Sequence, residues 1–366
     1  MISTEKFISL LNKNNIDFFC GVPDSCLNNF LNALNKTKKK NILVPNEGSA
    51  VSLGIGYHLK TKKIPLIYMQ NSGIGNATDP LTSLCPKTVY SIPMVLLIGW
   101  RGSPNIKDEP QHRMTGRIIT KMLKLFDIKT CILRSNTDLQ KAAKLIRYSK
   151  SKKKPVACII EPKIFSKVET KTKKNNYNNL IFRPDAIECI LNSIEKKTKI
   201  ISTVGYASRE LYQIKKDRKI KKGKSFLMIG GMGHTAMTSL GVALNEKKEV
   251  ICIDGDGSFL MHMGGVATAA VYSNTNFKYV LFDNNSHESV GGQPTISNML
   301  DLKKIALGFG FKKFFQIKNK SNFKKKLKKY IKQKGPSFIH IITKVGSLKK
   351  LERPSNILEI KHQFMG

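Results

Sequence analysis

Arginine and acidic residues are scarce in this chain of 366 residues. Only nine of its 63 cationic side chains are arginine, and 25 aspartates and glutamates leave a formal net charge of +38. Such a charge normally suggests nucleic acid or an anionic membrane as a partner. However, the lysines lie in short, scattered runs, and arginine, the better bidentate ligand for phosphate, is rare. We therefore expect a solvated lysine surface and no nucleic-acid partner.

Long apolar runs and paired cysteines are also missing. No run approaches the ~20 apolar residues of a membrane-spanning helix, and residues 1–15 predict an amphipathic helix rather than a signal peptide. The seven cysteines form no Cys-x-x-Cys pair, and several lie in apolar runs. Buried thiols in a reducing compartment explain this pattern, so we expect a cytoplasmic protein with no membrane partner.

Twelve short apolar runs, rich in β-branched residues, alternate with segments of helical spacing. Unbroken apolar strands separated by helices are typical of parallel sheets that are covered on both faces. Residues 166–184 lose this alternation and become polar and rich in Lys and Asn, as expected of a linker. The sequence therefore predicts two doubly wound α/β domains, 1–165 and 185–366, with no third domain between them.

The segment VICIDGDGS, residues 250–258, predicts a strand that runs into a glycine-rich turn and then a helix. Gly255 and Gly257 let the backbone approach a phosphate closely, and the amides at the helix start favour an anion. Asp256 between them suits a divalent cation such as Mg²⁺, which accepts carboxylate, amide and carbonyl oxygens. The alternative is a strand-ending turn that binds nothing.

The next predicted strand ends in Asn284-Asn285. Parallel neighbours bring their carboxyl ends side by side, so Asp256 and Asn285 can reach one ion. This Gly-Asp-Gly turn, the helix after it and the Asn pair resemble the cofactor motif of the thiamine diphosphate-dependent decarboxylases. The resemblance implies that the side chains of Asp256 and Asn285 and the carbonyl of His287 bind Mg²⁺. It also implies that Ser258 contacts the diphosphate.

The resemblance implies two further features, and both have candidates. Glu47, at a predicted helix start in VPNEGSAVSLGIGYHL, would share a proton with the pyrimidine ring and favour the imino tautomer of the cofactor. The alternative is an acidic residue placed there by the helix dipole. Met232, between Gly231 and Gly233, would be the apolar wedge beneath the cofactor, unless it is ordinary core.

Longer motifs narrow the resemblance. GVPDSCLNNF, LLIGWRGSPNIKDEPQHRMTGRI and DNNSHESVGGQPT resemble the phosphonopyruvate decarboxylases, with the sulfopyruvate decarboxylases as close relatives. This implies decarboxylation of 3-phosphonopyruvate to phosphonoacetaldehyde and carbon dioxide, with sulfopyruvate or another short 2-oxo acid as the alternative substrate. It also implies at least a homodimer with active sites at the subunit interface, because in this family the two domains around one cofactor come from different subunits.

Substrate-site candidates lie in the predicted turns. Asp24 resembles an acidic residue that handles protons in related decarboxylases, although a helix N-cap is an equal explanation. His112 resembles an active-site histidine of the family, and a neutral imidazole can donate or accept a proton; the alternative is a loop histidine of no consequence. Either Arg101 or Lys107 could pair with the phosphonate. A mobile cover is expected from Ser289, Gly291, Gly292 and Gln293.

Overall fold

The computed structural model describes residues 1–104, 106–168, 179–354 and 356–366. The chain divides into two compact units, Met1–Lys173 and Lys174–Gly366. Much of the linker predicted at 166–184 lies outside the described residues. No helix in the described ranges is long and apolar enough to cross a membrane.

The first unit is a six-stranded parallel sheet with strand order β2-β1-β3-β4-β6-β5. Its strands are β1 (Phe18–Gly21), β2 (Lys40–Leu43), β3 (Leu66–Gln70), β4 (Val95–Gly99), β5 (Lys129–Leu133) and β6 (Val156–Ile160). Its helices are α1 (Thr4–Lys13), α2 (Asn28–Leu34), α3 (Glu47–Thr61), α4 (Ile74–Ser83), α5 (Pro110–Leu125) and α6 (Leu139–Lys152), with the 3-10 turns η1 (Ser25–Leu27), η2 (Asn71–Gly73) and η3 (Asn136–Asp138).

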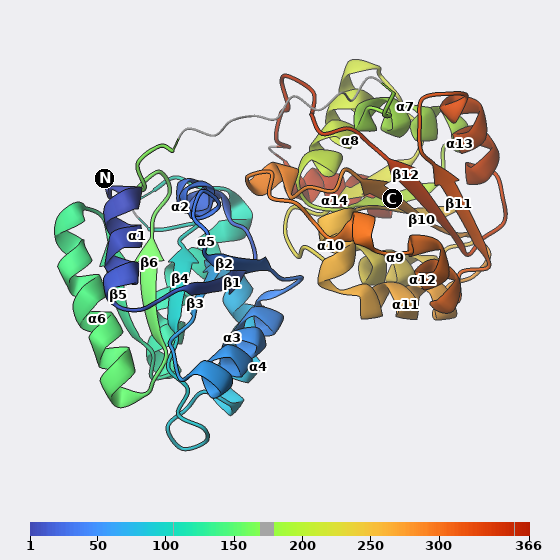
Figure 1. Ribbon diagram of the computed structural model, residues 1–366. Coiled ribbons are helices and arrows are strands. Elements are labelled where there is room, and N and C mark those ends of the chain that lie inside the picture. The colour runs from blue at the N-terminus through green and yellow to red at the C-terminus, as the bar shows by residue number, and fades with distance from the viewer. Residues whose placement is uncertain (105, 169–178, 355) are drawn as a thin grey trace. The chain divides into compact units, whose positions relative to one another are not determined.

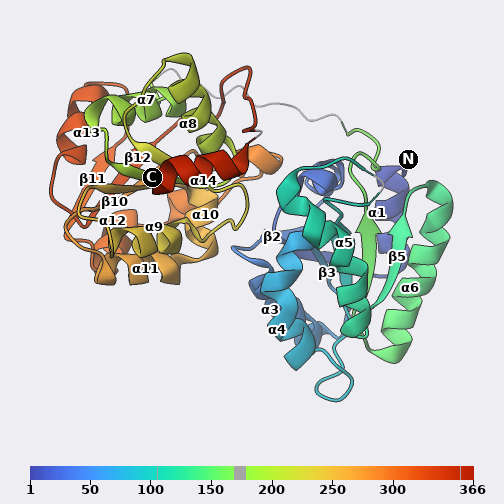
Figure 2. The same ribbon diagram turned by 180° about the vertical axis from the view of Figure 1, so that it is seen from behind.

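Helices cover both faces of this sheet. Side chains of α1, α2 and α6 form one core with the sheet, in which Phe7, Phe30 and Ile146 are buried. Helices α3, α4 and α5 cover the opposite face (Figure 2). The central strands β4 and β6 are buried at every position, which explains why their sequences are apolar without alternation.

The second unit repeats the architecture with strand order β11-β12-β10-β9-β7-β8, again all parallel. Its strands are β7 (Lys199–Ser202), β8 (Lys224–Leu227), β9 (Val250–Gly255), β10 (Phe277–Asp283), β11 (Lys313–Ile317) and β12 (Ser337–Ile342). Its helices are α7 (Arg183–Ser193), α8 (Tyr206–Asp217), α9 (Thr235–Ala243), α10 (Asp256–Met261), α11 (Met263–Tyr272), α12 (Leu302–Gly308), α13 (Phe323–Ile331) and α14 (Ile357–Met365), with the 3-10 turns η4 (Glu288–Val290) and η5 (Ser297–Met299).

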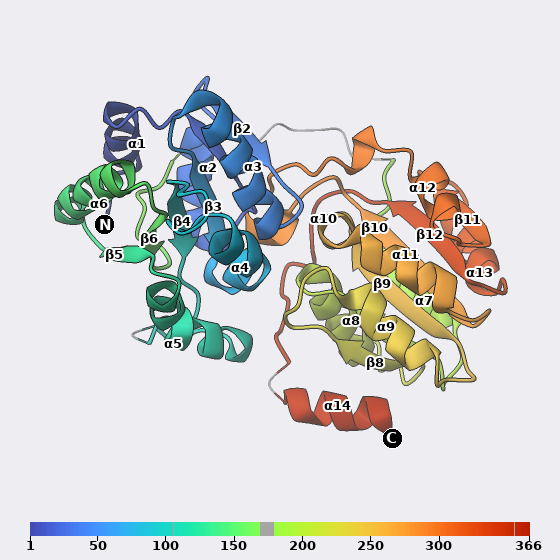
Figure 3. The ribbon, with the colours of Figure 1, turned by 90° about the horizontal axis from the view of Figure 1, so that it is seen from below.

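This second sheet is also covered on both faces. Helices α7, α8 and α13 pack on one face, and α9, α11 and α12 pack on the other (Figure 1). Helix α14 packs against the edge strand β8, and α9 and α11 lie side by side (Figure 3). The helix predicted after the glycine-rich turn is two short helices, because the backbone breaks at His262, where φ is −140° and ψ is 58°. Both units confirm the predicted doubly wound α/β fold.

The strand order determines where ligands can bind. In the second sheet β9 lies between β7 and β10, so the turns that follow these three strands meet at one edge. In the first sheet β1, β3 and β4 are likewise consecutive neighbours. Ligands of open α/β sheets bind beyond the carboxyl ends of the strands. Most predicted site residues follow these strands, while Glu47 follows the neighbouring strand β2 and Met232 follows the neighbouring strand β8.

Candidate active site

Asp256 follows β9 and is the first residue of α10, with 3% of its surface exposed. Burial raises the pKa of its carboxyl to about 7; a hydrogen bond from Thr295 opposes this shift, and the nearby charge of Asp283 adds to it. A buried carboxylate is costly unless a cation or donors compensate it. The position therefore fits a divalent cation.

Thr295 links the two predicted metal-ligand side chains. Its hydroxyl donates to Oδ2 of Asp256 at 2.5 Å and lies 3.2 Å from Oδ1 of Asn285. Asn285 has a left-handed backbone, with φ of 54°, and Ser297 also contacts its side-chain oxygen, at 3.3 Å. The structure thus brings Asp256 and Asn285 to one place, as their strands predict.

His287 lies in the same loop as Asn285, but its carbonyl is already hydrogen-bonded within the chain. Its carbonyl, the predicted third metal ligand, accepts hydrogen bonds from the amides of Val290 at 3.1 Å and Gly292 at 3.0 Å. To bind an ion this carbonyl must give up one of these bonds. The His287 ring lies against Gly257, where an added Cβ would be 2.8 Å from the ring. Burial lowers the pKa of the imidazole to about 4.

The donor chemistry of this region restricts the kind of ion. Across the described ranges no three His, Cys, Asp or Glu residues gather as a metal cluster. An ion beside Asp256 would therefore be held by carboxylate, amide and carbonyl oxygens. Mg²⁺ accepts such a set and usually completes it with phosphate or water oxygens.

The turn before α9 lies next to the Gly-Asp-Gly turn. Gly231 and Gly233 have φ of 67° and 86°, a conformation that glycine adopts without strain. The amide of Gly233 donates to Oγ of Ser258 at 3.0 Å, and the hydroxyl of Thr203 lies 3.1 Å from the same oxygen. The methyl of Met232 would lie 3.3 Å from a Cβ at Gly257. The predicted wedge and phosphate-binding residues are therefore neighbours of the Gly-Asp-Gly turn.

The residues predicted to form a mobile cover lie in the loop after β10, just beyond His287. Ser289 is exposed, while Gly291 and Gly292 have φ of 138° and 76°. Gln293 is only 4% exposed, and neither polar atom of its side-chain amide has a hydrogen-bond partner among the described residues. A buried, unpaired amide is unfavourable, so Gln293 fits a place where a ligand supplies the missing bonds.

Glu47 is the first residue of α3 and is 5% exposed. Its Oε2 accepts a hydrogen bond of 2.8 Å from Nδ2 of Asn76. Gly73 faces the same carboxyl, and a Cβ there would lie 2.2 Å from Oε1. Burial raises the pKa of Glu47, and the Asn76 bond opposes this rise. Glu47 is thus a buried carboxyl that tends to keep a proton, whereas residues placed by a helix dipole are usually exposed.

Asp24 is fully buried at the end of β1. Its Oδ1 accepts from the amide of Cys26 at 2.9 Å, which is an N-cap of η1, and its Oδ2 accepts from Nε2 of Gln70 at 2.9 Å. Gly99 must be small, since a Cβ there would lie 2.0 Å from Oδ1. The N-cap interpretation of Asp24 is therefore correct, but the bond to Gln70 goes beyond capping.

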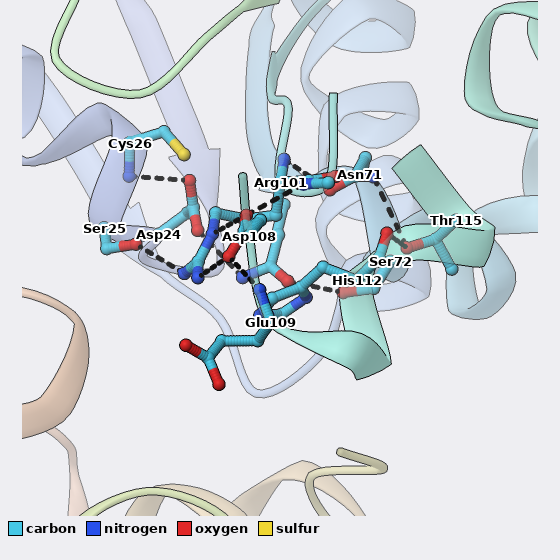
Figure 4. Close-up of polar contacts among 12 residues, drawn as sticks. Asp24, Ser25, Cys26, Asn71, Ser72, Arg101, Asp108, Glu109, His112 and Thr115 are labelled. Carbon is cyan, nitrogen blue, oxygen red and sulfur yellow. Dashed lines mark hydrogen bonds and ion pairs between the residues drawn. The ribbon is translucent and has the colours of Figure 1, made fainter. Parts of the chain in front are cut away.

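Arg101 follows β4 and lies beside Asp24 and Ser25 (Figure 4). Its guanidinium binds Asp108 through two parallel bonds, Nε to Oδ2 at 2.7 Å and Nη2 to Oδ1 at 2.6 Å. Its remaining nitrogen, Nη1, donates to Ser25 at 3.2 Å. Arg101, one of the two residues predicted to pair with the phosphonate, is therefore already paired within the chain.

The same loop continues into α5, which carries His112. Its Nδ1 is buried and has no partner among the described residues. Burial lowers the pKa of the imidazole, and the charge of Arg101 lowers it further, so the ring is neutral at pH 7. Lys107 is exposed, and its ammonium contacts no described residue. The loop therefore carries one neutral imidazole, His112, and one cation, Lys107, which has no hydrogen bond or ion pair with a described residue.

Sequence reasoning missed the residues that hold the predicted ones in place. Gln70, Asn76, Asp108 and Thr295 each bind a predicted site residue. Asp108 and Thr295 lie within two of the motifs quoted above, but the motifs do not show which residue each one contacts. Asp108 could have been recognised as a partner of Arg101, because both lie in the loop after β4. Asn76 lies in helix α4 and Thr295 in the loop after β10, so their contacts with Glu47 and Asp256 become visible only in the folded chain.

Comparisons with known proteins agree with this geometry. Residues 2–126 match the family described as "Thiamine pyrophosphate enzyme, N-terminal TPP binding domain", and residues 203–341 match "Thiamine pyrophosphate enzyme, C-terminal TPP binding domain". The fold and these two matches thus define a thiamine pyrophosphate enzyme.

Curated relatives extend over nearly the whole chain. The phosphonopyruvate decarboxylases of Streptomyces viridochromogenes and Streptomyces hygroscopicus are each 30% identical over 97% of this chain, covering 91% and 90% of their own lengths. The sulfopyruvate decarboxylase of Methanosarcina acetivorans is 25% identical over 98% of this chain and 96% of its own length. This chain therefore belongs to the thiamine pyrophosphate-dependent decarboxylases of the phosphonopyruvate and sulfopyruvate type. It is a carbon–carbon lyase that acts on a 2-oxo acid.

Proposed function

We propose that this protein converts 3-phosphonopyruvate to phosphonoacetaldehyde and carbon dioxide with thiamine diphosphate and Mg²⁺. The observation that carries the choice of substrate is the similarity to two phosphonopyruvate decarboxylases, 30% identical along 97% of the chain. The full-length sulfopyruvate relative is 25% identical. Phosphonopyruvate is therefore the first choice, and sulfopyruvate is the second candidate.

The second unit offers a set of groups for the diphosphate and the ion. Asp256, Asn285 and the carbonyl of His287 would hold Mg²⁺, while Ser258 and the backbone around Gly233 would contact the diphosphate. The buried carboxyl, the oxygen-rich donor set and the left-handed glycines support this assignment. When bound, thiamine diphosphate supplies an electron sink that accepts the electron pair left by the departing carboxylate.

The first unit supplies the groups that move protons. Glu47 would hold a proton on Oε1 or Oε2 and exchange it with the pyrimidine ring; its burial and raised pKa support this role. Asp24 and the neutral His112 would exchange protons with the substrate, and the unpaired Nδ1 of His112 supports a ligand contact. Lys107 would attract the phosphonate electrostatically, and Arg101, held by Asp108, would line the anion site.

We further propose a homodimer, or a larger assembly, in which two subunits share each cofactor. This proposal follows from the placement of Glu47 and Asp256 in different units of the chain and from the arrangement that the family resemblance implies. Sedimentation at several concentrations, with activity measured on the same samples, tests it. A monomer with full activity contradicts it.

One assay tests the substrate. Purified protein with thiamine diphosphate and Mg²⁺ is given phosphonopyruvate, sulfopyruvate and pyruvate in parallel, and kcat/KM is compared. We expect phosphonopyruvate to be preferred by at least about tenfold, equivalent to 1.4 kcal/mol of transition-state discrimination. A preference for sulfopyruvate establishes the second candidate, and activity with none of the three overturns the proposal.

A further inference from the structure

A buried ion cluster lies next to the segment that carries the predicted metal ligands. Arg183, the first residue of α7, is 6% exposed, and Glu210 on α8 is fully buried. The guanidinium donates through Nε and Nη2 to Glu210 at 2.7 and 3.0 Å. Its Nη1 donates to Glu288 at 3.1 Å. Arg183 thus connects the α7–α8 pair to the loop after β10.

Glu288 anchors both ends of the ligand-bearing segment. Its Oε2 accepts from Nδ2 of Asn284 at 2.9 Å, and its Oε1 accepts from the amide of Gly346, in the loop after β12. Asn284 directly precedes Asn285, and Glu288 directly follows His287. One carboxylate therefore ties down the chain on either side of two predicted ligands.

The energetics favour a positioning role for this cluster. Removing three charges from water costs free energy, and apolar residues of similar size often give equal or greater stability. Asn285 also holds a left-handed backbone, with φ of 54°, a conformation that asparagine tolerates and that sets the direction of its side chain. A cluster that costs free energy and borders such a residue is better explained by the geometry that it fixes than by stability.

We propose that Arg183 is a positioning residue for the divalent cation. Through Glu288 it holds the segment from Asn285 to His287 in the conformation that binds the ion. The inference rests on the proposed function, which assigns these two residues as metal ligands. Replacement of groups that orient metal ligands typically weakens metal binding about 10–100-fold.

The test measures binding of Mn²⁺, as a paramagnetic substitute for Mg²⁺, to the full chain with saturating thiamine diphosphate. Free Mn²⁺ is followed by electron paramagnetic resonance. We expect Arg183→Met and Glu288→Gln each to weaken Mn²⁺ binding about tenfold or more, with kcat largely restored at saturating metal. Both substitutions remove the same contact between Arg183 and Glu288. The double variant should therefore bind Mn²⁺ only slightly more weakly than the weaker-binding single variant.

Two further variants keep the test decisive. Arg183→Lys keeps the charge but lacks the planar guanidinium that binds two carboxylates, so we expect an intermediate loss of Mn²⁺ affinity. This variant serves as the test if Arg183→Met does not fold. Arg218→Met is the matched control, because Arg218, at the end of α8, pairs with Glu188 on α7 at 3.5 Å in an exposed ion pair. We expect this control to bind Mn²⁺ like the wild type.

The outcomes separate this inference from the proposed function. If folded Glu288→Gln binds Mn²⁺ like the wild type, or if the losses in the double variant add fully, the positioning role is wrong while the proposed function stands. If the wild-type chain binds no Mn²⁺ with thiamine diphosphate, the proposed function fails and this inference fails with it.

Discussion

Thr295 donates a hydrogen bond of 2.5 Å to Asp256, and the same hydroxyl lies 3.2 Å from Oδ1 of Asn285. One small side chain therefore spans two residues that follow different strands, β9 and β10. A hydroxyl has a single proton to donate, so the carboxylate and the amide keep further lone pairs for a cation. Thr295 thus holds the Asp256 carboxylate in place beside the Asn285 amide.

Replacing Thr295 tests this orientation. We expect Thr295→Val, which keeps the shape but loses the hydroxyl, to weaken divalent-metal binding about tenfold, measured by Mn²⁺ titration with thiamine diphosphate. Thr295→Ser should bind nearly as the wild type. Thr268→Val is the control, since among the described residues the Thr268 hydroxyl forms one exposed hydrogen bond, to the carbonyl of Gly264 in its own helix. Wild-type affinity in folded Thr295→Val would show that the bond has no orienting role.

The strands of this fold could be predicted because of how they are buried. The inner strands lie in parallel sheets covered on both faces, so their sequences are mostly apolar. The edge strands β2, β5, β8 and β11 are less buried, and each begins with a lysine. Several helices were harder to recognise. Helix α4 contains Asn, Thr, Asp and Pro80, which are typical of turns, and α13 has five lysines in nine residues with three buried apolar side chains. These helices form because packing in the folded unit, mainly against α3 for α4 and against α7 for α13, buries the few apolar side chains that they carry.

The site could be predicted only where neighbouring strands bring residues together. Asp256 and Asn285 were paired by the rule that parallel strands end at one edge. The contact between Arg183 and Glu288 joins residues 105 positions apart, and no periodicity marks it. The pairing of Arg101 with the phosphonate stays a prediction, but its bond with Asp108 was missed for a local reason. Asp108, seven residues on, binds it in two places, and a loop conformation of this kind is not encoded by spacing.

Metal binding should depend on pH through Asp256. Burial raises the pKa of this carboxyl to about 7 in the metal-free chain, and the ion binds only the deprotonated form. Protons therefore compete with the metal below pH 7, and the competition disappears above it. We expect the apparent affinity for Mn²⁺ with thiamine diphosphate to be about tenfold weaker at pH 6 than at pH 8. An affinity that is flat between these values would mean that Asp256 is ionised throughout.

Glu47 should be needed for turnover but little for cofactor binding. We expect Glu47→Gln to lower kcat by about 10²–10⁴-fold, the usual contribution of a positioned acid–base group. Thiamine diphosphate affinity, measured by calorimetry, should change only a few-fold. Glu5→Gln is the control, because Glu5 is also acidic in a first helical turn but is exposed. If the two variants behave alike, Glu47 serves only the helix dipole.

Gly73 should matter because it leaves room for Glu47. A Cβ at residue 73 would lie 2.2 Å from Oε1 of Glu47, whereas a Cβ at Gly75 would meet nothing within 4 Å. We expect Gly73→Ala to displace the carboxyl and reduce kcat about tenfold or more, since small misplacements of a reacting group are costly. Gly75→Ala should keep wild-type kinetics. Equal activity in the two variants would show that the carboxyl can move without loss.

Asp108 should control substrate binding through Arg101. Its carboxylate accepts four hydrogen bonds, two from the Arg101 guanidinium and one each from the amides of Gly102 and Glu109. Burial raises the pKa of Asp108, but the bonds from Arg101 and Gly102 outweigh it and the pKa is lowered. The carboxylate is therefore charged at every working pH and fixes the guanidinium beside Asp24 (Figure 4).

Asp108→Asn keeps the size of the side chain but removes the charge and one acceptor. The guanidinium then loses its bidentate partner, and we expect KM for the 2-oxo acid to rise about tenfold while thiamine diphosphate affinity stays unchanged. Asp127→Asn is the control, because it removes an exposed ion pair with Lys154 in the same unit, and such pairs contribute little. If KM is unchanged in folded Asp108→Asn, Arg101 does not contact the substrate, and Lys107 becomes the remaining candidate for the phosphonate.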